Sequence, residues 1–322
     1  MRLVDKALAG IGLALLTFAA SAQAPAHSLK IVVPFPPGGT QDLVARALAA
    51  PLQTLLNRNV IVENRAGAGG VVAAGYVARA EPDGDTVLLI NPGPAAIAPA
   101  MNKVPYDPIK DFAPVTQVAN LPFVLVTSTK FDAKDLTALI AAAKSNPGKL
   151  EYASAGIGSS GHLMGELFSQ TAGVSLLHIP YQGQGPSVTA VVAGEVKMSF
   201  TSPSPALFEM VRAGRMRMMA VSTPQPSRLV PGAPTLASAM PGFSVESWYG
   251  VVAPAKTAPE IVRALDAAIQ KVIAQPDFAR SLEALGCEPA IGVTSAQFGE
   301  LMAAEVKRWG QVVKSAKLEG AN

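Results

Sequence analysis

Short apolar runs alternate with segments of helical spacing along the first third of the chain. The runs KIVVPF, VIVEN and TVLLI predict strands, and apolar residues at helical spacing predict one helix over residues 40–57 and a second that ends at Arg79. Strands separated by helices of this length are typical of a parallel α/β sheet. This part of the chain is therefore expected to form one such sheet.

Residues 92–120 interrupt this rhythm. Proline recurs through them while apolar residues stay frequent, which predicts an ordered but irregular passage. A second alternating series follows, with strands at FVLVTS, LEYASA, SLLHI, KMSF and MRMMAVS and helices expected over residues 133–145, 161–171, 185–193 and 205–213. Two such series in one chain predict two α/β lobes.

The last third of the chain begins with a proline-rich connection at residues 231–243. The run WYGVVAP then predicts a further strand, and three helices are expected after it, over residues 259–274, 277–285 and 295–314. A length of 322 residues suits either two domains or one large α/β domain.

The N-terminal residues have the pattern of a secretory signal peptide. Arg2 and Lys6 precede the apolar run ALAGIGLALLTFAA, and SAQA supplies small residues at Ala20 and Ala22 for cleavage. A membrane-spanning helix is the alternative, but the apolar run is shorter than the roughly 20 residues that a bilayer needs. Residues 1–22 are therefore expected to be removed on export.

Cysteine content and charge narrow the compartment and the partners. Cys287 is the only cysteine, so no internal disulfide can form, and an exported protein without disulfides fits the bacterial periplasm. Loss of Arg2, Lys6 and Asp5 with the leader lowers the formal net charge by one from +3, which leaves too little charge for a nucleic-acid partner. No group of His, Cys, Asp or Glu has metal-ligand spacing, so no metal is expected.

The stretch PFPPGGTQDL after the first predicted strand has the composition of an anion-binding loop. Gly38 and Gly39 let the backbone turn sharply, and Thr40 is expected to cap the following helix and leave its amide groups facing outward. A phosphate loop would need Lys and then Ser or Thr here, whereas a Gln-Asp pair stands in their place, which argues against nucleotide phosphate. Asp42 suits the positive helix end and is expected to point toward Arg46 rather than toward a ligand.

A second glycine loop lies in ASAGIGSSGHLMGEL. Gly156, Gly158 and Gly161 match the dinucleotide pattern G-x-G-x-x-G, but the acidic residue that a nicotinamide site needs about 20 positions on is absent. What remains is a glycine-lined helix N-terminus with neutral donors at Ser154, Ser159, Ser160 and His162. The alternative is that these residues only form the turn and cap the helix. A third cluster, ENRAGAGG, is expected mainly to allow close packing or turning.

An exported enzyme is the main functional alternative. Ser159 or Ser160 with His162 or His178 would supply a nucleophile and a base, but no G-x-S-x-G elbow occurs in this loop. His162 is therefore expected to be a hydrogen-bonded partner rather than a base. A hydrolase or a nicotinamide-dependent oxidoreductase therefore stays open as an alternative function.

Several segments together resemble one protein family, the substrate-binding proteins of tripartite tricarboxylate transporters, which are also called TctC-like or Bug proteins. In chain order these segments are VPFPPGGTQDLVAR, VENRAGAGG, PDGDTVLL, YDPIKDFAPV, GSSGHLMGELF, HIPYQGQGP, SWYGVVAP and ARSLEALGCEP. The resemblance covers essentially the whole mature chain. It implies a monomeric periplasmic receptor, not an enzyme, that binds a small carboxylate without a cofactor and delivers it to a membrane permease.

The resemblance also implies a fold. Periplasmic binding proteins of type II, or Venus-flytrap, architecture have two α/β lobes with the ligand cleft between them. The first lobe would comprise residues 28–125 and 250–322, because the C-terminal helices return to it, and the second lobe residues 126–249. Closure is then a rigid-body rotation about connections near Val126 and Trp248.

The same resemblance implies a set of ligand-binding residues. In that family the loop after the first strand and the glycine-serine loop of the second lobe hold the ligand carboxylate through backbone amides, hydroxyls and ordered water. Carried over by position, the site residues are Phe35, Pro36, Gly38, Gly39, Thr40, Asn91, Ser154, Gly158, Ser159, Ser160, His162, Tyr181, Gln182 and Thr201. Such a site holds a carboxylate without a cation, which suits a carrier that must release its ligand.

The chain departs from the family pattern at three positions. Asp85 stands where the family often has Tyr, and Ala190 and Lys197 stand where Asp is common. These positions are expected on helix and strand surfaces outside the glycine loops. An altered surface is therefore expected, with the permease contact as one candidate.

Overall fold

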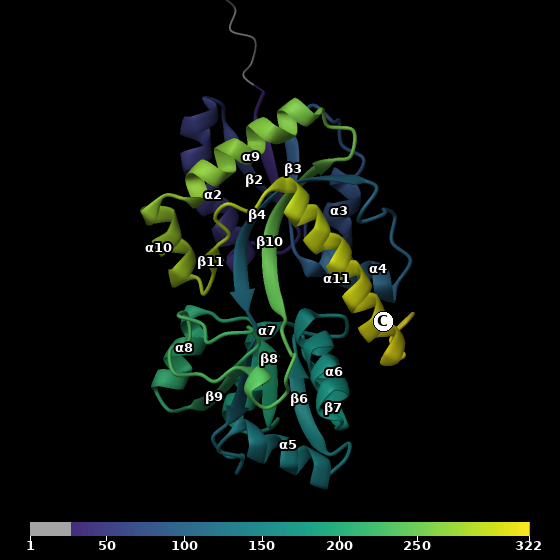
Figure 1. Ribbon diagram of the computed structural model, residues 1–322, viewed down its shortest axis with the longest axis vertical. Coiled ribbons are helices and arrows are strands. Elements are labelled where there is room, and N and C mark those ends of the chain that lie inside the picture. The colour runs from purple at the N-terminus through teal and green to yellow at the C-terminus, as the bar shows by residue number, and fades with distance from the viewer. Residues whose placement is uncertain (1–26, 322) are drawn as a thin grey trace, which may run out of the picture.

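Two lobes, each built on its own sheet, make up the elongated molecule (Figure 1). The computed structural model describes residues 27–321, so the predicted signal peptide at residues 1–22 lies outside the described part. The upper lobe in Figure 1 holds a six-stranded sheet and the lower lobe a five-stranded sheet. The prediction of two α/β lobes is therefore confirmed.

The first sheet is mixed rather than wholly parallel. Its strands are β1 Leu29–Val33, β2 Val60–Asn64, β3 Thr86–Ile90, β4 Phe112–Pro122, β10 Glu246–Pro254 and β11 Glu288–Pro289, in the order β11-β4-β10-β3-β1-β2. Strand β1 pairs parallel with β2 and β3, whereas β10 runs antiparallel to β3 and β4. The prediction that the first three strands form a parallel sheet is confirmed. The antiparallel pairs are added by later strands, because β10 arrives from the other lobe and not through a helical crossover.

The second sheet is also mixed. Its strands are β5 Val124–Ser128, β6 Leu150–Ser154, β7 Leu176–Pro180, β8 Met198–Thr201 and β9 Met216–Val221, in the order β7-β6-β8-β5-β9. Strand β6 pairs parallel with β7 and β8, and β5 pairs antiparallel with β8 and β9. Every strand that the sequence predicted for this lobe is present.

Helices cover both sheets. They are α2 Thr40–Leu56, α3 Val71–Val77, α4 Ala98–Met101, α5 Leu136–Ser145, α6 Ser160–Ala172, α7 Gln184–Ala193, α8 Pro205–Arg212, α9 Pro259–Ile273, α10 Pro276–Ala284 and α11 Ser295–Ser315. Short 3-10 or π turns lie at Ala68–Gly70 (η1), Gly93–Ile97 (η2) and Leu236–Ser238 (η3). Helix α5 begins later than predicted because Asp135 is its N-cap and accepts from the Ala138 amide at 2.8 Å.

Strand β4 contradicts the prediction that residues 92–120 are irregular. It pairs along its length with β10, although it contains Pro114, and proline cannot donate to a sheet. The Pro114 carbonyl accepts from Ser295 Oγ at 2.6 Å, so the polar groups of this residue face away from β10. On that side β11 pairs with Ala119 and Asn120 and does not extend to Pro114. The proline therefore lies beyond the β11 pairing and beside an irregularity in the β4–β10 register, between Val251 and Val252.

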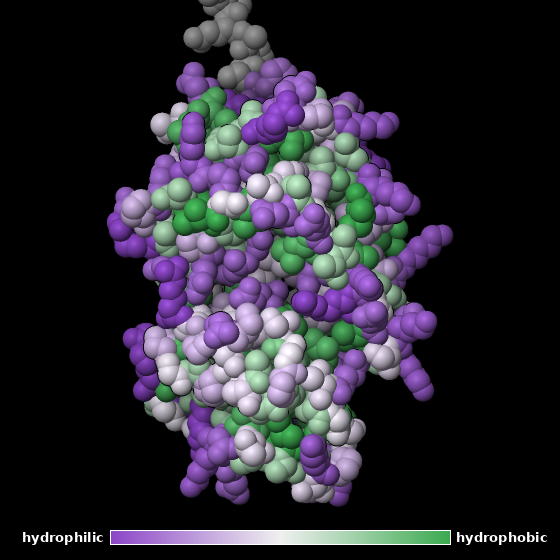
Figure 2. All heavy atoms as spheres, in the orientation of Figure 1, coloured by the Kyte–Doolittle hydropathy of each residue, from purple (hydrophilic) through white to green (hydrophobic). Residues whose placement is uncertain are grey.

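The chain passes between the lobes at two places. Strand β4 leads directly into β5 with Phe123 between them, and residues 222–245 return from β9 to β10. Val126 lies inside β5 and Trp248 inside β10. The return segment is rich in Ser, Pro, Gly and Ala. It runs over the front of the lower lobe, where Figure 2 shows mostly pale residues of intermediate hydropathy.

Helix α11 contacts both lobes. Phe298, in its first half, belongs to the core of the first lobe together with Trp248. Trp309, farther along, belongs to a cluster that it shares with Met101 of α4 and Phe168 of α6. Helix α11 therefore runs from the upper lobe to the lower one and braces their junction (Figure 1).

Gly250 is required by the packing of α11 on β10. A Cβ atom at this position would overlap the ring of Phe298, which packs edge-on against Trp248. We therefore expect Gly250→Ala to lower the free energy of unfolding by about 1 to 3 kcal/mol, the usual cost of overpacking a core. Urea unfolding measures this loss, with Gly310→Ala in α11 as the control, because an added Cβ there meets open space. An unchanged unfolding midpoint for Gly250→Ala would contradict this packing.

Candidate functional site

Asp42 organises the loop between β1 and α2. Its side chain is 2% exposed, and Oδ2 accepts from the Gly38 amide and from Arg46 Nε, both at 2.9 Å. Its Oδ1 accepts from Asn64 Nδ2 at 2.9 Å. Burial alone would raise the pKa of Asp42, but these donors and the charge of Arg46 outweigh it and hold the pKa below its usual range. Asp42 is thus a structural residue directed toward Arg46, as the sequence predicted.

Thr40 is not the cap of α2. Gly39 is the N-cap, Thr40 is already the first helical residue, and no side chain accepts from the first amides of the helix. The predicted threonine cap is therefore wrong, because Asp42 reaches back to the Gly38 amide and fixes the loop in its place. The amides at the start of α2 keep their capacity to bind an anion.

Gln41 fixes Asn91 at the end of β3. Its Nε2 donates to the Leu89 carbonyl at 2.6 Å, and its Oε1 accepts from Asn91 Nδ2 at 3.1 Å. Asn91 Oδ1 in turn accepts from the Gly93 amide at 3.1 Å. Gln41 is one of the two residues that stand where a phosphate loop has Lys and then Ser or Thr. Here it orients the side chain of Asn91.

Four hydrogen bonds fix the loop between β6 and α6. Ser159 is the N-cap of α6, and its Oγ accepts from the His162 amide at 3.3 Å. His162 Nδ1 accepts from the Gly158 amide at 3.1 Å. Ser154 Oγ accepts from the Gly156 amide and donates to its carbonyl, both at 3.1 Å. His162 is therefore a hydrogen-bonded partner, as predicted.

Two histidines stack behind this loop. The ring centroids of His162 and His178 lie 3.9 Å apart at an interplanar angle of 13°, and Ser154 Oγ is 2.6 Å from His178 Nε2. Burial lowers the pKa of each ring to about 4, and at His178 the charge of His162 adds to the shift. Ser154 is only 1% exposed, so this Ser-His pair does not face a substrate.

A cavity of about 500 Å³ lies between the two lobes. Its lining comes from loops and strand ends of both lobes and consists of Phe35, Gly69, Asn91, Gly93, Phe123, Ala155, Ile157, Gly158, Ser159, Ser160, Gly161, Gly183, Gln184, Ser187, Phe200, Thr201 and Ser202. None of these lining residues carries a charge at neutral pH. The cavity therefore offers aromatic surface, hydroxyls and amides to a ligand, but no fixed ion.

The cavity lies where parallel strands end and helices begin. Asn91 follows β3, residues 155–159 follow β6, and Thr201 is the last residue of β8. Helices α6 and α7 begin at the cavity, with Ser160 and Gln184 as their first residues. The amides and positive dipole ends of such helix starts favour an anion. Carboxyl ends of strands are also where open α/β sheets bind their ligands.

The structure brings only part of the predicted site to this cavity. Six predicted residues line it, namely Phe35, Asn91, Gly158, Ser159, Ser160 and Thr201. The other predicted residues between β1 and the start of α2 lie outside the lining, namely Pro36, Gly38, Gly39 and Thr40. Two predicted residues are buried behind the β6–α6 loop, Ser154 and His162, and two precede the start of α7, Tyr181 and Gln182.

Several lining residues were not singled out from the sequence. Gln184 and Ser187 come from the first turn of α7, and Phe123 comes from the crossing between β4 and β5. Phe200 lies in β8, and Gly69 belongs to the glycine cluster that was expected mainly to serve packing or turning. Gln184 could have been predicted as a site residue, because it lies at the start of the helix predicted over residues 185–193 and helix starts often bind anions.

The three departures from the family pattern differ in their surroundings. Ala190 is 3% exposed in the core of the second lobe, so its predicted surface position is wrong. Helix α7 turns this residue inward, with Val188 and Val191 in the same cluster. Asp85 pairs with Arg58 at 2.8 Å and directly precedes β3, at the opposite end of this strand from Asn91. Lys197 is half-buried.

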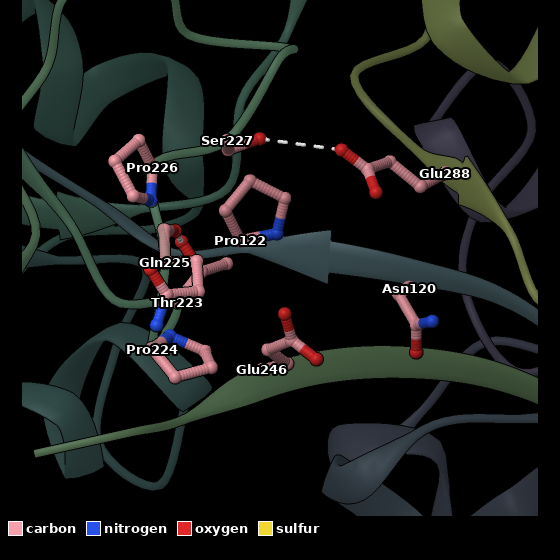
Figure 3. A pocket seen from close by; sticks show the side chains of 9 residues that line it. All are labelled: Asn120, Pro122, Thr223, Pro224, Gln225, Pro226, Ser227, Glu246 and Glu288. Atoms are coloured by element: carbon pink, nitrogen blue, oxygen red, sulfur yellow. Dashed lines mark hydrogen bonds between the residues drawn. The ribbon is translucent and has the colours of Figure 1, made fainter. Parts of the chain in front are cut away.

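A smaller cavity of about 150 Å³ lies beside the crossing strands (Figure 3). Glu246 and Glu288 both line it, and Ser227 Oγ donates to Glu288 Oε1 at 3.4 Å across it. Burial, together with the charge of Glu288, raises the pKa of Glu246. Two carboxylates make this cavity unsuited to an anionic ligand. It belongs to the junction of the lobes.

Comparison with known proteins assigns the chain to a family. The model of the tripartite tricarboxylate transporter family receptor matches residues 44–318. The chain belongs to this receptor family. It is therefore a periplasmic solute receptor and not an enzyme, and the hydrolase and oxidoreductase hypotheses are set aside. Within residues 27–321, no helix is both long enough and apolar enough to cross a membrane.

Relatives of this receptor match it along nearly its whole length. It is 39% identical over 319 residues to the protein of the tcbD-tcbE intergenic region of Pseudomonas sp. strain P51, which covers 97% of this chain and 94% of that protein. It is 37% identical over 300 residues to protein BugT of Bordetella pertussis, which covers 92% of this chain and 91% of BugT.

Solved structures confirm the two-lobe fold of the receptor. The periplasmic binding protein BugD has a TM-score of 0.77 and 31% identity, covering 91% of this chain and 98% of BugD. MatC from Rhodopseudomonas palustris with bound malate has a TM-score of 0.78 and 32% identity, covering 90% and 99% of the two chains. A protein of R. palustris solved with adipate has a TM-score of 0.81 and 33% identity, covering 91% and 98%.

Proposed function

We propose that this receptor binds a small dicarboxylate in the cavity between its lobes. The observation that carries the proposal is the lining, which is free of charged side chains and is entered by the starts of α6 and α7. Helix starts stabilise an anion, and without a fixed cation the anion remains easy to release. Malate and adipate, the ligands of two related structures, are both dicarboxylates.

The proposed site uses both lobes. Ser159 and Ser160 with the first amides of α6, and Gln184 at the start of α7, hold one carboxylate from the second lobe. Asn91, oriented by Gln41, faces the ligand from the first lobe. Aromatic residues of the lining supply apolar surface for the carbon chain. A ligand that contacts both lobes favours the closed arrangement.

Closure is proposed to be a rotation about the two crossings. The lobes are proposed to comprise residues 28–125 with 250–322 and residues 126–249. The sheets change at Phe123 and before Glu246, so each proposed boundary falls a few residues inside a strand, β5 or β10. The closed receptor is proposed to act as a monomer and to deliver its ligand to the permease of a tripartite tricarboxylate transporter. Family membership supports this partner.

Thermal unfolding with malate and adipate, each compared with its diamide, tests the proposed ligand class. A ligand at a hundred times its dissociation constant stabilises the folded form by about 2.7 kcal/mol, which raises Tm by several degrees in a chain of this size. At least one dicarboxylate is expected to raise Tm, and the neutral diamides are not. Absence of a shift with every member of a broad carboxylate panel would contradict the proposal.

Filling the cavity from Ala155 is expected to weaken binding. Ala155 is exposed and lines the cavity just after β6, so an indole at this position takes the place of the ligand. We expect Ala155→Trp to raise the Kd for the carboxylate by more than about tenfold, measured by calorimetric titration. Ala141→Trp, at an exposed position of α5 away from the cavity, is the matched control. Wild-type affinity in Ala155→Trp would mean that the ligand binds elsewhere.

A further inference from the structure

The Gly158 amide is held by a histidine ring behind the cavity wall. Gly158 lines the cavity, and its N–H donates to His162 Nδ1 at 3.1 Å. The residue has a φ of +74°, and a Cβ at this position would press against Met101 Sδ of the other lobe. The loop at residues 155–159 is therefore confined between the His162 ring on one side and Met101 on the other.

The ring of His162 is itself held by its neighbours. It is 3% exposed and stacks on His178, which in turn stacks on Tyr152 with centroids 4.9 Å apart and contacts Ser154. His162 Nε2 lies 3.9 Å from Glu166 Oε1, which accepts from Tyr152 Oη at 2.8 Å. The titratable groups that face His162 are therefore His178, Tyr152 and Glu166, from β7, β6 and α6.

These contacts fix the tautomer of His162. A backbone amide donates to Nδ1 only when that nitrogen carries no proton, so the ring proton is on Nε2, on the side of Glu166. Burial lowers the pKa of His162 to about 4, so the ring is neutral at pH 7. A second proton would have to bind Nδ1. The protonated Nδ1 and the Gly158 N–H would then both be donors, and no hydrogen bond could form between them.

We infer that His162 is a positioning residue of the cleft, whose Nδ1 lone pair holds the Gly158 amide and thereby fixes the loop at residues 155–159 that lines the cavity. The inference rests on the proposed function, since that function assigns the loop to ligand binding. Protonation of Nδ1 turns the acceptor into a donor and releases the Gly158 amide. Ligand affinity then falls in acid for a reason separate from the titration of the ligand itself.

Two matched substitutions at His162 test whether the acceptor must lie at the place of Nδ1 or whether any polar side chain at this position suffices. His162→Asn keeps an acceptor, because its Oδ1 takes the place of Nδ1 and does not titrate. His162→Gln carries its oxygen one bond farther out, near the place of Nε2, and loses the bond to Gly158. His27→Asn is the control, because the His27 side chain is 79% exposed at the edge of the first lobe.

The first readout is hydrogen exchange of the Gly158 amide in the ligand-free protein, followed by NMR. At pH 7 the wild type, His27→Asn and His162→Asn are expected to protect this amide, and His162→Gln is expected to exchange it at least about tenfold faster. At pH 4 the wild type is expected to be less protected than His162→Asn at the same pH. Equal exchange in the Asn and Gln variants would overturn the inference.

The second readout is calorimetric titration with malate and adipate at pH 7 and pH 4. At pH 7 His162→Asn is expected to bind as the wild type does, and His162→Gln at least about tenfold more weakly. At pH 4, where about half of the wild-type rings carry the second proton, its affinity is expected to be about twofold below that of His162→Asn. Equal affinities of the Gln and Asn variants would also overturn the inference. If neither dicarboxylate binds the wild type while the exchange rates differ as expected, the proposed ligand class fails and the role of His162 in fixing the loop stands.

Discussion

Replacement of Trp309 by alanine is expected to lower the free energy of unfolding by about 3 to 5 kcal/mol, the usual cost of deleting a large buried aromatic side chain. Trp309 is 1% exposed near the end of α11, in the cluster that joins this helix to α4 and α6. Its Nε1 donates to Glu305 Oε2 at 2.8 Å, and Glu305 Oε1 accepts from Arg308 at 2.7 Å. The substitution therefore removes packing and also takes one donor from a buried carboxylate.

Urea unfolding at pH 7 measures this loss against two controls. Trp309→Phe keeps most of the packing and loses the indole N–H, so its cost is expected to be about 1 to 3 kcal/mol. Lys307→Ala changes an exposed position of the same helix and is expected to stay within about 0.5 kcal/mol of the wild type. If Trp309→Ala were as stable as Lys307→Ala, α11 would not brace the junction of the lobes.

Acidification from pH 6.5 to pH 4 is expected to destabilise the fold through its stacked histidines. Folding lowers the pKa of His162 and His178 from 6.5 to about 4, so the unfolded chain binds more protons than the folded one in this window. Their contribution to stability is complete above pH 6.5 and is lost progressively as the pH falls to 4. For His162 a shift of this size corresponds to about 3 kcal/mol.

The acid effect of the histidines must be separated from that of buried carboxylates. Burial raises the pKa of Glu246 and Glu305, so these groups oppose the histidines as the pH falls. The double variant His162→Asn with His178→Gln retains the carboxylates and lacks the titrating rings. Denaturant titrations at pH 7, 5.5 and 4.5 are expected to show a steeper loss in the wild type than in this variant. Parallel curves would contradict the assignment to the histidines.

Most strands were predictable because each is a short apolar run. A buried strand needs apolar residues whichever strand it pairs with, so its own sequence is sufficient to indicate it. Strand β4 was not predictable from its own sequence. It contains Pro114, and proline is not expected in a strand that is hydrogen-bonded on both sides. The partner that makes it a strand, β10, lies more than 120 residues farther along the chain. The antiparallel direction of β10 was hidden for the same reason, since no local pattern records that it returns from the other lobe.

The glycine loops were predictable, but the contacts of their individual residues were not. Thr40 and Asp42 both have side chains suited to a helix start, and only the folded loop shows that Asp42 takes the Gly38 amide. Phe123 and Phe200 look like strand core in the sequence, and they line the cavity because the two lobes meet there. Proximity of this kind depends on tertiary structure, which periodicity does not encode.

The strand order of the first sheet also determines when each lobe can fold. Strand β10 lies between β3 and β4, so β4 cannot join β1, β2 and β3 until residues 246–254 are available, whereas the second sheet is contiguous from Val124 to Val221. In a chain that emerges N-terminus first, the sheet of the second lobe can therefore form first. Until β10 is available, the edges of β3 and β4 that pair with it stay unpaired, and unpaired strand edges are prone to aggregate. Assembly of the first lobe after export therefore depends on the C-terminal quarter of the chain, which supplies β10.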